Sequence, residues 1–297
     1  MQRYCYAGPV VFAKPQGNQT SRVPLKAGAE IFGASGIAAD AEVIGLMLEA
    51  LQEANMHSPV LLLGHMGIYL GLVEQLLAEG RLDEARRSAL FACIQRKGAS
   101  DIRDLLDDST TAAMLAALPD LMGDIGVFES AREALQQAPE GVLAALQELQ
   151  ELSTMVKARY PQVDLRIDVS ELSGYGYHNG PVFAVYHPQH GSALAQGGRY
   201  DGVGDAFGRG RAATGFDMNL KQLMANAFEQ SGAYFAPYAA DESQAGLAVF
   251  VKALRDQGHR VIVAVAEDEQ SPQDCLGTLI HDQDGWQVRP TITAPNE

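Results

Sequence analysis

Four glycine-bearing segments carry polar and aromatic side chains that could bind a ligand. They are residues 28–33 (GAEIFG), 174–180 (GYGYHNG), 197–202 (GGRYDG) and 214–217 (TGFD). Glycine inside a strand usually marks a bulge or the close approach of a ligand or another backbone. None is a phosphate-binding loop, because the sequence has neither GxxxxGK[ST] nor GxGxxG followed by a helix. Each segment alone also fits a strand end or a tight turn, so only the set as a whole indicates a binding site.

The first of these segments belongs to a predicted hairpin. Residues 3–12 and 25–32 alternate and are rich in β-forming side chains, whereas residues 14–22 (KPQGNQTSR) are polar and contain turn formers. This pattern predicts two antiparallel strands around a mobile loop. Alternate residues of a strand point to one face, so positions 26, 28 and 30 are expected to share a face.

A long stretch of the chain, residues 82–160, predicts an almost wholly helical block. Leu, Ala, Glu, Gln and Arg dominate it, and it lies between strand-rich segments as an insertion would. Outside it we expect helices at 40–54 and 68–78 and from Leu220, and strands at 59–64, 163–169, 177–186, 193–200 and 213–218.

The C-terminal part predicts a small separate unit. It contains a strand after Ala233, a helix at 243–257, a strand at 260–266, and short strands around Leu279 and Trp286, which together fit a βαβ-type domain. The chain is therefore expected to be an α+β protein with a core at 1–80 and 161–230, a helical insertion at 81–160 and a C-terminal domain at 233–297.

Composition excludes several classes of protein. The 297 residues include 22 Lys and Arg against 37 Asp and Glu, a formal net charge of −15, which argues against broad nucleic-acid or anionic-membrane binding. Cys5, Cys93 and Cys275 have no CxxC spacing, and the histidines other than His178 have no metal-ligand spacing, so we expect no disulfide, metal or cofactor. Residues 59–73 are too few and too broken to span a bilayer, and the start has no secretory pattern, which predicts a soluble cytoplasmic protein.

Together, the glycine segments resemble histidyl-tRNA synthetase, a class II aminoacyl-tRNA synthetase. RYCYAGPVVF resembles the second class II motif, LKAGAEIFG the strand after it, GYGYHNGPVF the histidine-binding motif and GGRYDG the glycine-rich strand beneath the amino acid. TGFDMNLKQL stands where the third motif belongs. The resemblance covers residues 2–223 and implies an antiparallel sheet flanked by helices, with the helical block in the place of the synthetase insertion.

The sequence departs from the synthetase where ATP would be held. Residues 11–14 (VFAK) replace the Arg and Glu of the second motif, Lys221 and Gln222 replace the Glu-Arg of the third, and Ser173 replaces the Arg that opens the histidine motif. Amino-acid activation needs fixed cations on the phosphoryl group, and each lost contact removes about 3 kcal/mol of transition-state stabilisation. The departures argue against a working synthetase.

The sequences of these motifs resemble more closely those of a paralogue, the regulatory subunit of ATP phosphoribosyltransferase. AGAEIFG, YHNGPVFAVY and GGRYDG followed by FGRGRAATGF carry this resemblance, with Arg209, Arg211 and the run to Phe216 as the most discriminating residues. It implies a non-catalytic subunit that forms a hetero-oligomer with the short catalytic subunit, activates it in histidine biosynthesis and allows feedback inhibition by histidine. It also implies no nucleic-acid or membrane partner.

The resemblance further implies a histidine pocket. Glu30 matches the pocket glutamate, and Lys26, where the family usually has Gln, would point at the same ligand or pair with Glu30. His178 replaces the second residue of a tyrosine pair; it could bind the ligand or be a structural histidine. Arg199 and Asp201 favour a structural salt bridge under the site. The expected histidine-binding residues are Glu30, Lys26, Gly28, Tyr175, Tyr177, His178, Asn179, Gly197, Gly198, Arg199 and Gly215.

Two further features bear on the alternatives. Members of the resembled family have a segment before the RYCYAG strand with the first class II motif, a dimer interface and further pocket residues, whereas this sequence begins inside the second motif. In residues 233–297 the acids outnumber the four Lys and Arg, so an anticodon-binding role is not expected of this domain. The alternative functions are a histidyl-tRNA synthetase core or another synthetase-like transferase.

Overall fold

The computed structural model describes residues 1–13, 21–106, 109–172, 176–188, 190–204, 208, 210–229, 232–239, 243–272, 275–283 and 285–291. The chain divides into two compact units, Met1–Leu223 and Met224–Glu297. Among the helices that these residues form, none combines the length and hydropathy needed to cross a membrane.

An eight-stranded sheet is the centre of the larger unit. Its strand order is β1-β2-β8-β7-β6-β3-β5-β4, and every neighbouring pair is antiparallel except β3 and β5. The strands are β1 (Gln2–Pro9), β2 (Leu25–Phe32), β3 (Val60–His65), β4 (Met122–Gly123), β5 (Asp164–Asp168), β6 (Pro181–Tyr186), β7 (Ala195–Arg199) and β8 (Ala213–Asn219).

The predicted hairpin is confirmed. β1 and β2 pair in antiparallel register from Gln2 opposite Phe32 to Pro9 opposite Leu25, and the Phe12 N–H donates to the Arg22 carbonyl at 2.9 Å. Residues 14–20, the centre of the predicted mobile loop, lie outside the described part of the chain.

The start of one predicted strand is wrong, and one short strand was not expected. The strand expected from Tyr177 begins only at Pro181, because residues 176–180 form a turn in which Gly176 has a φ of 82°. The block at 82–160 is mostly helical, as expected, but it also contains the short strand β4, which pairs with β5 at the edge of the sheet. A two-residue strand has too few positions for a period of two to be visible in the sequence.

Helices cover one face of the sheet. α1 (Ile37–Glu53) packs against β2, β7 and β8, and α7 (Glu140–Arg159) packs against α1 and β3. Residues of β2 that alternate toward these helices, such as Ala29 and Ile31, are buried in the core. The opposite face of β2, β7 and β8 is thus left to form the wall of a cavity.

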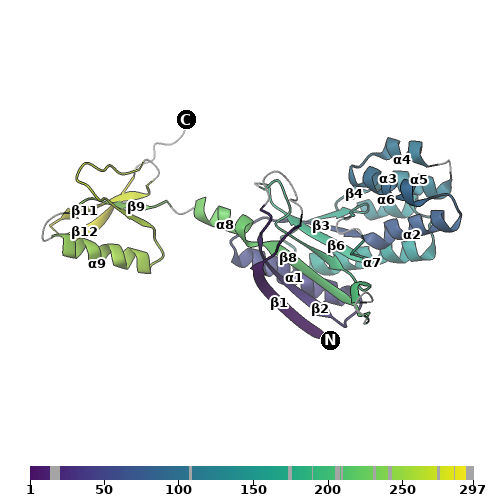
Figure 1. The fold of residues 1–297 in the computed structure, drawn as a ribbon, viewed down its shortest axis with the longest axis horizontal. Coiled ribbons are helices and arrows are strands. Elements are labelled where there is room, and N and C mark those ends of the chain that lie inside the picture. The colour runs from purple at the N-terminus through teal and green to yellow at the C-terminus, as the bar shows by residue number, and fades with distance from the viewer. Residues whose placement is uncertain are drawn as a thin grey trace. The chain divides into compact units, whose positions relative to one another are not determined.

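The remaining helices of the larger unit gather beside β4 (Figure 1). Their apolar side chains continue the core of the sheet, since Leu72, Leu90 and Leu115 belong to the same buried cluster as Leu61. These helices are α2 (Met66–Ala78), α3 (Glu84–Gln95), α4 (Ala99–Leu105), α5 (Thr110–Ala117) and α6 (Val127–Ala134), with a 3-10 turn at Leu118–Asp120.

The smaller unit has its own four-stranded sheet in the order β10-β9-β11-β12. β9 and β10 are parallel and are connected through α9, whereas β11 and β12 form an antiparallel hairpin. Leu247 and Val251 of α9 pack with Leu279 in its core. Its elements are β9 (Tyr234–Ala236), α9 (Ser243–Asp256), β10 (Val261–Val263), β11 (Gly277–Asp282) and β12 (Gly285–Pro290); α8 (Leu220–Glu229) follows β8.

Candidate functional site

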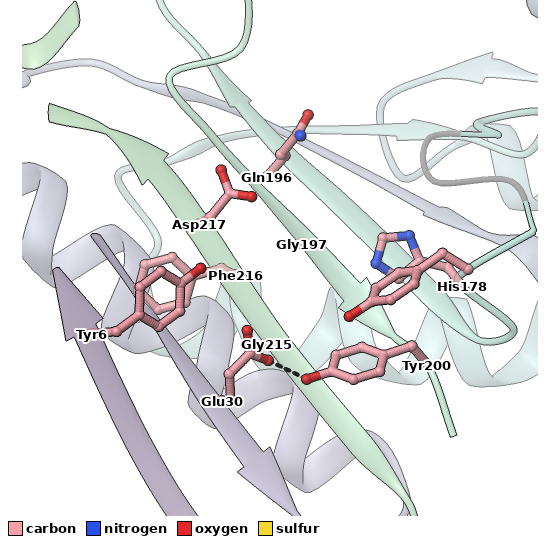
Figure 2. Close-up of a pocket in the computed structure, with 10 residues that line it drawn as sticks. Tyr6, Glu30, His178, Gln196, Gly197, Tyr200, Gly215, Phe216 and Asp217 are labelled. Carbon is pink, nitrogen blue, oxygen red and sulfur yellow. Dashed lines mark hydrogen bonds between the residues drawn. The ribbon is translucent and has the colours of Figure 1, made fainter. Parts of the chain in front are cut away.

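A cavity of about 320 Å³ lies on the face of the sheet opposite α1. This volume is at the small end of the range for ligand pockets. The cavity is formed where β1, β2, β8 and β7 are neighbours, so segments far apart in the sequence supply its wall. Its lining residues are Tyr6, Glu30, Tyr177, His178, Gln196, Gly197, Tyr200, Gly215, Phe216 and Asp217 (Figure 2).

Two acids of the cavity, Glu30 and Asp217, each lie opposite a glycine, of which Gly215 lines the cavity and Gly28 does not. In the register of β2 and β8, Glu30 lies opposite Gly215, and Gly28 lies opposite Asp217. A Cβ on Gly215 would be 1.6 Å from Glu30 Oε2, and a Cβ on Gly28 would be 2.3 Å from the Phe216 carbonyl oxygen. Gly215 therefore makes the room in which the Glu30 carboxylate lies across β8, and Gly28 makes room for the Tyr6 ring. This is the close approach that the sequence indicated.

Glu30 is held by an aromatic neighbour. The Tyr200 hydroxyl donates a hydrogen bond to Glu30 Oε2 (Figure 2). Burial raises the pKa of Glu30, as does the nearby Asp217 carboxylate, while the Tyr200 hydrogen bond opposes the rise. The rings of Tyr177 and Tyr200 are stacked with centroids 4.7 Å apart, and the His178 ring lies edge-on to Tyr177 at 5.0 Å. This end of the cavity combines a carboxylate with flat rings.

Lys26 pairs with Asp217. Its Nζ is 2.6 Å from Asp217 Oδ1, and its side chain is only 15% exposed. From the sequence, Lys26 was expected to point at a ligand or to pair with Glu30. In the structure its ammonium group pairs with Asp217 instead. Asp217 was missed by sequence reasoning, although the TGFD segment contains it and strand alternation places it on the same face as Gly215.

Of the two glycines of β7, Gly197 lines the cavity and Gly198 does not. A Cβ on Gly197 would be 2.1 Å from the Gly215 carbonyl oxygen, and one on Gly198 would be 2.8 Å from His178 Cδ2. Gly198 thus admits the His178 ring over the strand. Sequence reasoning missed Gln196, Tyr200, Tyr6 and Phe216 as lining residues.

Arg199 does not line the cavity. On the helical side of the sheet its guanidinium pairs with Asp40 of α1 and, at 3.0 Å from Oε1, with Glu148 of α7. Arg199 is 12% exposed and Asp40 is fully buried. Arg199 therefore forms a structural salt bridge under the site, but with Asp40 and Glu148 rather than with Asp201. Asp201 instead accepts a hydrogen bond from the Ala213 N–H at 2.9 Å.

A histidine belongs to the same network. His65 Nε2 lies 2.9 Å from Glu148 Oε2, and the Gly67 N–H donates to His65 Nδ1 at 3.0 Å. Because Nδ1 accepts, Nε2 carries the proton and donates to Glu148. His65, together with Arg199, lowers the pKa of Glu148 to about 2. These contacts give His65 a structural role beneath the cavity.

The other expected residues have different places. Asn179 lies outside the cavity lining, where its Oδ1 accepts a hydrogen bond from the Asp201 N–H at 3.2 Å. Tyr175 and Ser173 lie outside the described residues. Across the described part of the chain, no group of three or more His, Cys, Asp or Glu side chains is arranged to hold a metal ion.

The described positions where a synthetase holds ATP carry other residues. Phe12 stacks beneath Lys26, whose Nζ is 5.5 Å from the ring centroid. Gln222 Nε2 donates to Ser192 Oγ at 2.9 Å, and Lys221 is exposed at the start of α8. Arg211 donates to Gln2 Oε1 at 3.0 Å, while Lys14 and Arg209 lie outside the described residues.

A mainly antiparallel sheet with helices on one face and an acidic, glycine-floored cavity on the other defines a histidyl-tRNA synthetase-like protein. The protein-family model described as "Histidyl-tRNA synthetase" matches residues 1–223. The family model described as "ATP phosphoribosyltransferase subunit HisZ C-terminal domain" matches residues 231–289. A crystal structure of an ATP phosphoribosyltransferase regulatory subunit/histidyl-tRNA synthetase from Bacillus halodurans has the same fold, with a TM-score of 0.67 and 24% identity, covering 91% of this chain and 69% of that one.

The particular family is shown by a closer relative. The ATP phosphoribosyltransferase regulatory subunit of Pseudomonas syringae pv. syringae (strain B728a) is 41% identical over an alignment that covers 97% of this chain and 73% of the relative. The chain belongs to the family of ATP phosphoribosyltransferase regulatory subunits. The fold is also similar to a chain of the ATP phosphoribosyltransferase (HisG:HisZ) complex from Thermotoga maritima, with a TM-score of 0.54 and 19% identity, covering 73% of each chain.

Proposed function

We propose that this chain assembles with the short catalytic chain of ATP phosphoribosyltransferase in the cytoplasm, raises its activity, and binds free L-histidine as a feedback inhibitor. In this proposal the chain also associates with itself inside a hetero-oligomer. Histidine would occupy the cavity between β2, β7 and β8, and no catalytic step would take place there.

One observation carries the proposal: the cavity keeps the amino-acid end of a synthetase site without the phosphate end. Glu30 and Tyr200 provide a carboxylate and a hydroxyl for an imidazole or an ammonium group. By the resemblance to the synthetase, residues 11–14 (VFAK) and Lys221-Gln222 stand where it has its ATP-binding arginines, and neither stretch contains an arginine. Activating an amino acid requires cations on the phosphates. Without them, the remaining use of such a pocket is reversible binding of the amino acid.

The partner role rests on family membership. The Thermotoga maritima structure is named as a complex of HisG and HisZ, and the Pseudomonas relative is named as a regulatory subunit. We therefore assign the same kind of partner to this chain. The acidic charge of −15 fits a protein-facing role better than a tRNA-facing one.

The test measures phosphoribosyl transfer by the short catalytic chain, with and without this chain and with and without histidine. We expect the rate to rise on adding the chain and to fall again with histidine. A rise without suppression would refute the sensing role, and no rise would refute the partner role.

The Glu30→Gln variant links suppression to the cavity. Each variant is scored by its rate with histidine divided by its own rate without histidine, so that assembly defects cancel. We expect suppression to weaken in Glu30→Gln. The same change at Glu53, an exposed residue of α1, serves as the matched control and is expected to leave the ratio unchanged.

A further inference from the structure

The two ends of the cavity differ in chemistry, and this difference suggests how a ligand lies in it. Glu30 and Tyr200 are at one end, and Asp217 and Gln196 are at the other (Figure 2). Gly215 and Asp217 are two residues apart on β8, which separates the positions by about 6.8 Å. A histidine-sized molecule therefore reaches from one acid to the other.

The Glu30 end suits a ring. The Tyr177 and Tyr200 rings stack there, and the Tyr200 hydroxyl occupies one oxygen of Glu30. A flat imidazole can pack against such rings while one ring N–H donates to the carboxylate. An ammonium group makes poorer use of this end, because its donors point in three directions.

The Asp217 end suits an ammonium group. Gln196 is directly opposite Asp217 on β7, so an amide oxygen and a carboxylate border the same part of the cavity. Lys26 reaches Asp217 from β2, and it is not among the residues that line the cavity. Among the described lining residues, none is Lys or Arg, so the wall favours the cationic end of an amino acid over its carboxylate.

We propose that Asp217 accepts the ammonium group of the bound amino acid and that Lys26 is a positioning residue that holds this carboxylate in place. The inference rests on the proposed histidine site. It assigns the ammonium contact to a residue of β8 and gives Lys26 an indirect role.

The experiment compares three ligands by isothermal titration calorimetry on the full chain. L-Histidine has both charged groups, histamine lacks the carboxylate, and 3-(imidazol-4-yl)propanoate lacks the ammonium. In Asp217→Asn we expect the affinity for histidine and histamine to fall at least tenfold, because hydrogen bonds between charged groups are the stronger ones. The affinity for the propanoate is expected to stay the same or to increase, because a repelling carboxylate has been removed.

The Lys26→Met variant distinguishes a positioning role of Lys26 from direct contact between Lys26 and the ligand. We expect the same pattern as in Asp217→Asn, with a smaller loss, because Asp217 is still present but less well held. A loss for histidine and the propanoate that spares histamine would show that Lys26 binds the ligand carboxylate, and would overturn its assigned role.

Control measurements distinguish failure of this inference from failure of the proposed histidine site. Asp164→Asn removes an acid of the same sheet that pairs with Arg166 at 2.8 Å, and it is expected to change none of the three affinities. Equal losses for all three ligands in Asp217→Asn, or no loss, would overturn the inference while leaving the histidine site intact. Failure of the unaltered chain to bind histidine would instead refute the proposed function, and the inference with it.

Discussion

The Arg199→Met substitution tests the buried ion network beneath the cavity. Arg199 joins β7 to two helices, because its guanidinium contacts Asp40 of α1 and Glu148 of α7. Methionine retains an unbranched side chain but has no charge and no donor. The substitution therefore leaves the fully buried Asp40 without its cation.

The burial of Asp40 sets how much free energy of unfolding the substitution removes. Breaking a buried pair by removing one partner destabilises a protein by about 3–5 kcal/mol. Burial already raises the pKa of Asp40, so in the variant this carboxyl takes up a proton rather than remain charged. Protonating an Asp at pH 7 costs about 4 kcal/mol, since its free pKa is about 3.9 and each unit is about 1.36 kcal/mol. We therefore expect a loss of about 3–4 kcal/mol at pH 7.

The size of this loss depends on pH. A folded-state pKa above the unfolded value favours the folded state as pH falls. At pH 5 protonation costs only about 1.5 kcal/mol. The stability deficit of Arg199→Met should thus shrink by more than half between pH 7 and pH 5.

Urea unfolding followed by far-UV circular dichroism measures the deficit at both pH values. With a slope of about 3 kcal/mol per M, the midpoint at pH 7 should fall by roughly 1 M. Trp286, the single tryptophan, lies on β12 of the smaller unit, so its fluorescence follows that unit. Its transition is expected to stay where it is.

Arg159→Met is the matched control. Arg159 also joins α7 to α1, through Glu49 at 3.4 Å, but it is 61% exposed. Exposed pairs contribute about 0–1 kcal/mol, so little change is expected. A loss below 1 kcal/mol for Arg199→Met, or an equal loss at pH 5 and pH 7, would refute the argument that an unpaired buried Asp40 sets the cost.

Two further predictions concern the cavity. Gly215→Ala should weaken histidine binding at least tenfold, because its Cβ would lie 1.6 Å from Glu30 Oε2 and 2.8 Å from the Ala29 carbonyl oxygen; calorimetry measures this, and Gly8→Ala, with no atom within 4 Å of its Cβ, is the control. Histidine affinity should fall as pH drops through the raised pKa of Glu30, because a protonated carboxyl is a weaker acceptor for the ring N–H of the ligand than a carboxylate is. In Tyr200→Phe this loss should move to higher pH, since the hydrogen bond that lowers the Glu30 pKa is gone; identical pH profiles for the two proteins would contradict the role of Tyr200.

Part of the site could be read from the sequence because it depends on one strand at a time. The alternation in β2 put Lys26, Gly28 and Glu30 on one face before any partner strand was known. The glycines at 197, 198 and 215 also indicated close approach, and each has a neighbour that a Cβ would strike. The predicted strand at Tyr177 was wrong because the turn at 176–180 overrides the local β-rich composition.

The sequence by itself determined the class of fold, the family and the residues of β2 that share a face with Glu30, because motif sequences and strand alternation are properties of short segments. Only the tertiary structure decided that Lys26 pairs with Asp217, 191 residues away, and that Arg199 is tied to Asp40 and Glu148 from two helices. These partners follow from the register of strands and the packing of helices across the sheet. Register and packing depend on contacts among distant segments that no local pattern specifies.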